Sequence, residues 1–420
     1  MRSWITIRKM QKNFKLAFAY GPVVGAIFSV VSIPLMLLAL DKEDVGRYSY
    51  YFAVCNIASQ IISLGLDHSI IRFSDASASA WNNLLRSSML SSGPIIILGL
   101  VLAFFYSAEL ALFIFFGAVL TNLIRYAGAY CRVEGRAVEF NFLLVVPRLV
   151  VVLSFLYLWL TQIERTYLFV ITSYLVGLCG CVGFFLCLGI LNNRDKVVTF
   201  GLRGAGEHIK YALPIWGVAF VSVLMINFDK ILLSKIFDYD TLGIYTLGYN
   251  LMNGLMLISV LFSTIYVPFA IKNIPKHQYY RNRFTVILTL IYMTFATVSC
   301  YILTAAIGKF FSDYNEVADI LLLLLTVPLL AVFIELRNCD YYISKRTGWL
   351  FVSQCIAFSF FIAAIAIYYE KLNLITFCCI YLLMYITTYL LRLGKNAFKA
   401  KIFIQILLVF VFNTVYLYGW

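Results

Sequence analysis

Charged residues are scarce in this sequence. Only 13% of its 420 residues are Asp, Glu, Lys or Arg, against roughly 25% in an ordinary soluble domain. Hydrophobic residues make up 62% of the chain, and a soluble fold of this composition would have no polar coat to cover its core. The composition therefore excludes a water-soluble protein and predicts an integral membrane protein.

Residues that build catalytic and metal sites are also few. The three His residues form no HExxH motif, and the ten Cys lie almost entirely within apolar runs, without His or carboxylate partners at metal-ligand spacing. The glycine-rich stretch at 201–207 lacks the Lys-Ser/Thr of a phosphate-binding loop. We therefore predict a protein that is not an enzyme and that has no metal and no cofactor.

Apolar runs of about 20 residues recur along the chain, each long enough to cross a hydrocarbon core of about 30 Å as a helix. We predict twelve spans, near residues 15–40, 45–66, 84–106, 109–131, 141–161, 167–190, 209–236, 243–268, 284–306, 316–336, 348–369 and 373–392. A further run at 402–419 is either a thirteenth span or an interfacial helix. The predicted fold class is an all-α polytopic membrane protein.

The basic residues predict the orientation of these spans. With a cytoplasmic N-terminus, 25 of the 33 Lys and Arg residues lie at the inner side, seven lie at the outer side, and Arg148 lies within a span. Most of the +13 net charge then serves to hold the inner loops in the cytoplasm near anionic lipids. Nucleic acid is not needed as a partner to explain it.

Two acidic turns, Asp41–Tyr48 and Asp238–Tyr245, match each other 197 residues apart. Both read Asp-x-acid-x-aliphatic-Gly-x-Tyr, and the same offset pairs Asn56 with Asn253. A chance match is the alternative, because short turns favour Asp and Gly. A true repeat of six spans each predicts two parallel six-helix bundles around a central cavity. We place them at 1–195 and 209–395, with a cytoplasmic connector at 196–208 and a basic segment at 396–420 that includes the possible thirteenth span.

Charges within the spans are the candidate functional residues, since each costs about 2.5–3.5 kcal/mol at a helix centre on insertion scales. Arg148 lies about 12 Å into the fifth span, on the same face as Asn141. In the fourth span, Arg125 is followed by Arg132 and Arg136 at +7 and +11. We expect these three arginines to form a cationic stripe on one helix face that rises from the cytoplasm.

The second span carries a polar face of its own. Asn56, Gln60 and Asp67 follow one another at helical spacing, and the face continues to Arg72. In the seventh span, Asp229 and Lys230 lie toward the outer side. These positions add neutral acceptors and two carboxylates to the arginines.

Two interpretations of these residues stay open. Arg125 and Arg148 could line a water-filled cavity and bind an anion, because two guanidinium groups match the oxygens of a doubly charged head. Alternatively, Arg148 pairs with Asp67 and Asp229 with Lys230, while the remaining arginines extend to the interface. We expect the Gly21/Gly25 pair to mark a close contact between helices rather than a ligand site.

The stretches at 40–73 and 209–245 resemble polysaccharide flippases of the Wzx type, within the MATE-like multidrug/oligosaccharidyl-lipid/polysaccharide exporter superfamily. The shared pattern is an Asp-bearing seventh helix followed by a Gly-x-Tyr turn, and a Leu-Gly-Leu…Arg-Phe ending of the second helix. Length, span number and the repeat extend the resemblance over residues 10–395.

This resemblance implies a V-shaped pair of bundles that opens alternately to the two sides. It also implies that an undecaprenyl-diphosphate-linked oligosaccharide is flipped to the outer leaflet of a bacterial inner membrane for O-antigen or capsule assembly. The polysaccharide polymerase and the chain-length regulator are candidate partners, along with membrane lipids. Arg72, Arg132 and Arg136 would collect the diphosphate, Arg125 and Arg148 would hold it beside Asn56 and Gln60, and Asp229 or Asp67 would couple the cycle to H⁺ or Na⁺.

Two rival functions remain at this point. A multidrug or metabolite cation antiporter of the same fold would need deep carboxylates, whereas the deep charges here are mainly arginines. A membrane-embedded glycosyltransferase or polymerase would need a large outer loop to carry its active site, and no such loop is evident in the sequence.

Overall fold

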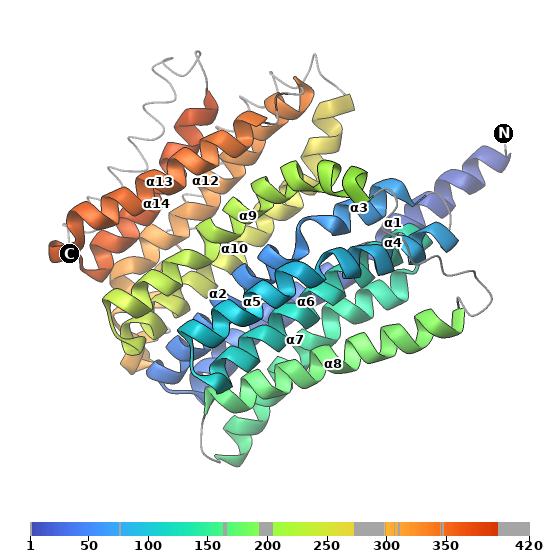
Figure 1. The fold of residues 1–420 in the computed structure, drawn as a ribbon. Coiled ribbons are helices and arrows are strands. Elements are labelled where there is room, and N and C mark those ends of the chain that lie inside the picture. The colour runs from blue at the N-terminus through green and yellow to red at the C-terminus, as the bar shows by residue number, and fades with distance from the viewer. Residues whose placement is uncertain are drawn as a thin grey trace. The chain divides into compact units, whose positions relative to one another are not determined.

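The computed structural model describes residues 2–74, 77–162, 166–192, 205–272, 298, 300–305, 307–309, 311–344, 346 and 348–393. Within them every regular element is a helix (Figure 1). Nine of these helices are long and apolar enough to cross a membrane, or ten if a bent pair counts as one span. The predicted span at 284–306 lies mostly outside the described residues, and the possible span at 402–419 lies wholly outside them. Most of the predicted connector at 196–208 also lies outside the described residues.

The chain divides into two compact units, Met1–Tyr239 and Asp240–Trp420. The helices of the first unit are α1 (Arg2–Ala39), α2 (Lys42–Ser63), α3 (Leu66–Phe73), α4 (Ser77–Leu90), α5 (Ser92–Phe105), α6 (Ala108–Glu134), α7 (Ala137–Thr161), α8 (Tyr167–Asn192) and α9 (Ala205–Ile236). Those of the second are α10 (Tyr239–Lys272), which begins at the boundary, α12 (Val317–Ile343), α13 (Gly348–Tyr368) and α14 (Leu374–Leu393), with short 3₁₀ turns at Ser312–Tyr314 and Tyr369–Lys371.

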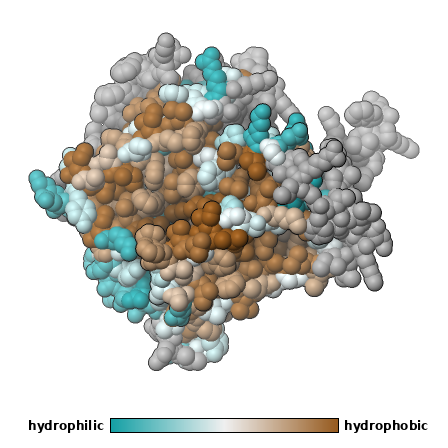
Figure 2. All heavy atoms as spheres, in the orientation of Figure 1, coloured by the Kyte–Doolittle hydropathy of each residue, from teal (hydrophilic) through white to brown (hydrophobic). Residues whose placement is uncertain are grey.

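In the first unit, α1 packs along α7, and α2 packs against both α6 and α9. Large aromatic side chains fill the spaces between these helices, and Tyr51, Tyr126, Tyr130 and Phe155 are fully buried. Large apolar side chains are also exposed, such as Phe104 at 83%, and brown hydrophobic residues cover much of the face in Figure 2. A fold that buries apolar side chains and also exposes them along its helices suits a lipid environment.

In the second unit, α12 and α13 both pack against α14. Arg392 of α14 is only 3% exposed and donates hydrogen bonds to Asn338 Oδ1 at 2.6 Å and Ser353 Oγ at 3.1 Å. These acceptors belong to α12 and α13, so one guanidinium ties three helices together.

The second predicted span is broken rather than continuous. Leu64 and Gly65 both have positive φ, 46° and 67°, and the chain bends by 45° between α2 and α3. The expectation that Asp67 and Arg72 continue the polar face of Asn56 and Gln60 at helical spacing is therefore wrong. Two left-handed residues end one helix and start another, which resets the direction of the side chains that follow.

The predicted three-arginine stripe is shorter than expected. Helix α6 ends at Glu134, and Gly135 caps it with a φ of 74°. Arg136 lies beyond that cap and precedes α7, so it shares no helix face with Arg125 and Arg132. A glycine at this position lets the chain adopt the left-handed conformation that terminates a helix.

Helix boundaries reproduce the repeat offset found in the sequence. Helix α1 ends at Ala39 and α9 at Ile236, while α2 begins at Lys42 and α10 at Tyr239; both pairs are 197 residues apart. In the first copy, the Asp41 side chain accepts a hydrogen bond from Asp44 N at 2.9 Å and caps α2. By this offset α9 opens the second half of the chain, yet it packs within the first compact unit. The bundle limits of 1–195 and 209–395 stay predictions.

Candidate functional site

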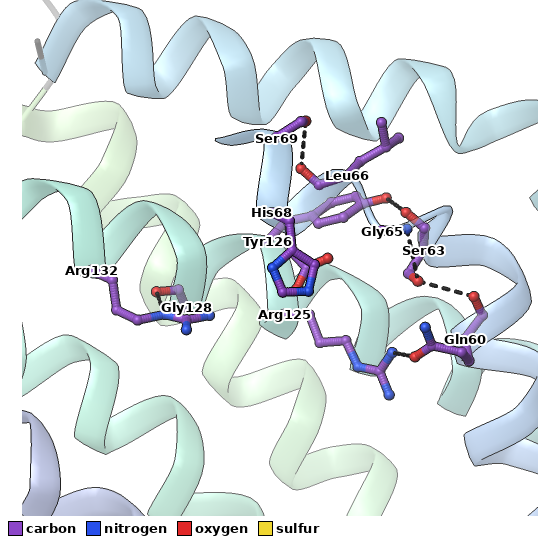
Figure 3. Close-up of polar contacts among 11 residues, drawn as sticks. Gln60, Ser63, Gly65, Leu66, His68, Ser69, Arg125, Tyr126, Gly128 and Arg132 are labelled. Carbon is purple, nitrogen blue, oxygen red and sulfur yellow. Dashed lines mark hydrogen bonds and ion pairs between the residues drawn. The ribbon is translucent and has the colours of Figure 1, made fainter. Parts of the chain in front are cut away.

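Arg125 and Gln60 meet between α6 and α2 (Figure 3). The Arg125 guanidinium donates to Gln60 Oε1 at 2.5 Å, and Gln60 is only 6% exposed. Asp67, across the bend between α2 and α3, interacts electrostatically with Arg125 but makes no ion pair with it. A neutral amide thus holds the arginine, which leaves its positive charge without a contacting carboxylate.

Tyr174 of α8 is within electrostatic range of both predicted arginines. It interacts electrostatically with Arg148 and with Arg125, although the two arginines come from α7 and α6. The structure therefore brings the pair predicted from the sequence to one region of the first unit. Nothing in the sequence marked Tyr174, because it is one of 29 tyrosines.

Arg148 is solvent-exposed in the structure and has no hydrogen-bond or ion-pair partner among the described residues. Exposed apolar residues of α7 lie on more than one side of the helix: Leu153 and Tyr157 are about 140–180° from Arg148 at 100° per residue, whereas Trp159 is about 20° from it. The helix therefore presents exposed apolar side chains both opposite Arg148 and beside it.

The Gly21/Gly25 contact predicted from the sequence is confirmed. A Cβ at Gly21 would lie 2.9 Å from the Asn141 Cα, and one at Gly25 would collide with the Arg148 guanidinium. Asn141 donates to Ala17 O at 2.8 Å and accepts from Gly21 N at 2.9 Å. These are two backbone groups that a regular α1 would join to each other, so the Asn141 side chain is committed to helix packing.

Helix α9 contacts the polar face of α2 at two points. Trp216 Nε1 donates to the backbone oxygen of Gln60 at 2.7 Å, and Asn56 Nδ2 donates to Asn227 Oδ1 at 3.4 Å. Gln60 therefore binds Arg125 through its side chain and α9 through its backbone. The role of Trp216 had no signal in the sequence, since the contact depends on which backbone oxygen its ring meets.

The two acidic candidates, Asp229 and Asp67, have different partners. Asp229 is 1% exposed and forms an ion pair with Lys230 at 3.2 Å, so this predicted pair is confirmed. Asp67 approaches His68 at 3.9 Å and forms no ion pair with Arg148. The predicted Arg148–Asp67 pair is therefore wrong, because the bend after α2 gives Asp67 a direction that helical extrapolation did not foresee.

The three shallower arginines do not join the deep pair. Arg132 donates to Gly128 O at 3.4 Å and lies over the Phe140 ring at 5.6 Å, and Figure 3 shows its side chain apart from that of Arg125. Arg136 lies over the Tyr130 ring at 5.5 Å, while Arg72 is exposed. Stacked or exposed guanidinium groups remain accessible to an anion.

A separate apolar cavity of ≈ 320 Å³ lies between α2, α5 and α9. Lys235 is the one cation in its lining, and neither Arg125 nor Arg148 contributes to it. In the described part of the chain, no group of three or more His, Cys, Asp or Glu residues could hold a metal ion.

Solved structures of transporters share this fold. The lipid II flippase MurJ in an inward closed conformation matches with a TM-score of 0.65 and 14% identity, over 95% of this chain and 91% of that chain. An inward-facing multidrug resistance MATE family transporter of the MOP superfamily matches with a TM-score of 0.68 and 10% identity, over 92% and 95%. The MATE multidrug transporter DinF-BH matches with a TM-score of 0.61 and 15% identity, over 93% and 96%.

Sequence comparison adds the family. A search among curated proteins finds no match. The family model described as polysaccharide biosynthesis protein, in contrast, matches residues 16–272, more than half of the chain. Its transporter fold agrees with this match and with the absence of an enzyme signature in the sequence. The chain therefore belongs to the polysaccharide biosynthesis protein family, and it is a multi-pass membrane protein with the fold of the MurJ and MATE transporters.

Proposed function

We propose that this protein flips an undecaprenyl-diphosphate-linked oligosaccharide repeat unit from the inner to the outer leaflet of a bacterial inner membrane, for O-antigen or capsule assembly. The family match and the fold shared with a lipid II flippase support a lipid-linked substrate. The N-terminus lies in the cytoplasm, as the positive-inside rule predicts.

The observation that carries this proposal is that Arg125 and Arg148 both lie within electrostatic range of Tyr174. Neither guanidinium has a carboxylate in contact among the described residues. Two uncompensated cations are costly in a membrane protein unless water or an anion reaches them. A diphosphate supplies several oxygens and more than one negative charge, which matches two guanidinium forks.

Transport by alternating access assigns a role to each remaining candidate. Arg72, Arg132 and Arg136 collect the diphosphate at the cytoplasmic side, Arg125 and Arg148 hold it, and Asn56 and Gln60 supply neutral hydrogen-bonding groups. Asp67 or Asp229 couples the cycle to H⁺ or Na⁺. Asp67 is the better placed of the two, because Asp229 already forms an ion pair with Lys230.

The alternative is a cation antiporter, which the multidrug MATE transporters of the same fold represent. Such a pump needs a deep carboxylate that is free to meet a cationic substrate. In the described part of the first unit, the buried carboxylate of Asp229 is paired and the deep charges near Tyr174 are positive. This arrangement favours an anionic substrate.

Complementation of a bacterial flippase deletion tests the proposal. Arg125→Ala and Arg148→Ala should each abolish surface polysaccharide while the protein inserts at a normal level, and Arg148→Lys should retain part of the activity. The matched control is Arg47→Ala, which removes an exposed arginine that pairs with Glu43. Normal export by Arg148→Ala, or loss of a fluorescent cationic drug from cells without any rescue of polysaccharide, would refute the anion assignment.

A further inference from the structure

His208 lies in the first turns of α9 and is only 5% exposed. Its Nδ1 is 3.2 Å from Ser69 Oγ of α3, and its Nε2 is 3.2 Å from Arg86 Nη1 of α4. The Phe73 ring of α3 covers the imidazole, with 4.6 Å between ring centroids. One side chain therefore joins α9 to both helices.

These contacts define the tautomer of the imidazole. Ser69 Oγ donates its single hydrogen to Leu66 O at 2.7 Å, so toward His208 it can only accept, and Nδ1 carries a hydrogen. Arg86 can only donate, so Nε2 must offer its lone pair. The arrangement requires a neutral imidazole that is protonated on Nδ1 alone.

A second proton would break this arrangement. It would place an N–H on Nε2 opposite the Arg86 N–H, which removes one hydrogen bond and brings two cations into contact. Among the described residues, the charged groups near His208 are Arg86 of α4 and Glu207 of its own helix, whereas α3 contributes the uncharged Ser69 and Phe73. An imidazole ordinarily gains this proton near pH 6.5, within the range that cells experience.

The contact of His208 lies at the start of α9, apart from the other contacts of this helix with the first unit. Trp216 and Asn227 bind α2 farther along the helix, so His208 holds the start of α9. By the 197-residue offset, α9 opens the second half of the chain while packing on the first unit. In a transporter that alternates access, contacts between the two repeats must form and break.

We propose that His208, Ser69 and Arg86 form a proton-sensitive latch, which holds the start of α9 against α3 and α4 and releases it when His208 binds a second proton. The effect of the latch on flipping rests on the proposed function. Its release is a property of the protein alone and can be measured without a substrate.

Hydrogen–deuterium exchange of the full chain in lipid nanodiscs tests the latch. Peptides that cover the start of α9 are compared at about pH 8 and about pH 5.5, on either side of the ordinary imidazole pKa, after correction for the intrinsic pH dependence of exchange. We expect these amides to exchange severalfold faster at the lower pH, because the doubly protonated imidazole no longer holds the start of α9 against Arg86. Equal corrected rates at the two pH values would overturn the proposal.

Variants separate the latch from a general effect of acid. His208→Gln keeps an acceptor for Arg86 and a donor for Ser69 but cannot take a proton, so slow exchange is expected at both pH values. His208→Lys carries a permanent charge and should exchange fast at both. His68→Gln is the matched control, because its histidine side chain is 45% exposed, and it should keep the wild-type response. A pH response that persists in folded His208→Gln also contradicts the latch.

A second variant tests the latch if a His208 variant fails to fold. Arg86→Gln removes the opposing cation while keeping a donor for Nε2, and it should reduce the pH response of the start of α9. Failure of the latch appears in exchange rates measured without substrate, whereas failure of the proposed function appears as normal export by the Arg125 and Arg148 variants. The two results are therefore distinguishable.

Discussion

The guanidinium of Arg125 donates a hydrogen bond to the buried amide oxygen of Gln60, across the interface of α6 and α2. A glutamate at position 60 would satisfy the same geometry and add a negative charge. The neutral amide therefore holds Arg125 in place without cancelling its charge.

Gln60→Glu should reduce export more than Gln60→Met. The carboxylate would pair with Arg125 and compete with an anionic substrate, whereas methionine of similar length leaves the arginine unpaired. Surface polysaccharide in a complemented flippase deletion is the measurement, normalised to the amount of inserted protein. Greater export by the glutamate variant than by the methionine variant would contradict an anion-binding role for Arg125.

Gly21→Ala and Gly25→Ala should have different consequences. At Gly21 the new methyl group meets the Asn141 backbone, so α1 and α7 must separate and the thermal unfolding temperature should fall. At Gly25 it meets the end of the flexible Arg148 side chain, so the fold should stay stable while export falls. Gly180→Ala is the control, because nothing lies within 4 Å of its Cβ position. Equal stability of all three variants would argue against the close α1–α7 contact.

Lys230→Met should destabilise the first unit strongly. It removes the ammonium partner of a carboxylate that is 1% exposed, and breaking a buried pair from one side typically costs about 3–5 kcal/mol. The double variant Asp229→Asn/Lys230→Met should recover much of this loss. Thermal unfolding in detergent measures both, and a double variant no more stable than Lys230→Met would show that the pair is not the cause.

Asp41→Ala should cost about 1 kcal/mol of stability, because the Asp41 side chain caps α2 through Asp44 N. Asp41→Asn should be nearly neutral, since asparagine caps a helix as well as aspartate does. Unfolding temperatures of the two variants provide the comparison. If both lose the same stability, the charge of Asp41 matters rather than its hydrogen bond.

Much of the fold followed from composition and periodicity. Long apolar runs dictate helices in a bilayer because the backbone has no other way to satisfy its hydrogen bonds there. The offset between the Asp41 and Asp238 turns likewise located matching helix boundaries, because a capping residue fixes where its helix starts. The family also followed from residues that the sequence displays directly.

The geometry of the candidate site depends on breaks between helices and on contacts between residues that are far apart in the sequence. Extrapolating helical spacing failed at Gly65 and at Gly135, where positive φ ends a helix and changes the direction of Asp67 and Arg136. A glycine in an apolar sequence signals close packing and a break equally well, so the residue type alone did not distinguish Gly21 from Gly135.

The sequence by itself determined that the chain spans a membrane and that matching turns recur 197 residues apart, because apolar burial and helix capping depend on residue type. Only the tertiary structure decided which groups meet. Gln60 rather than Asp67 holds Arg125, and Ser69 with Arg86 defines the tautomer of His208. These contacts join helices far apart in the chain, and their geometry depends on how the helices pack.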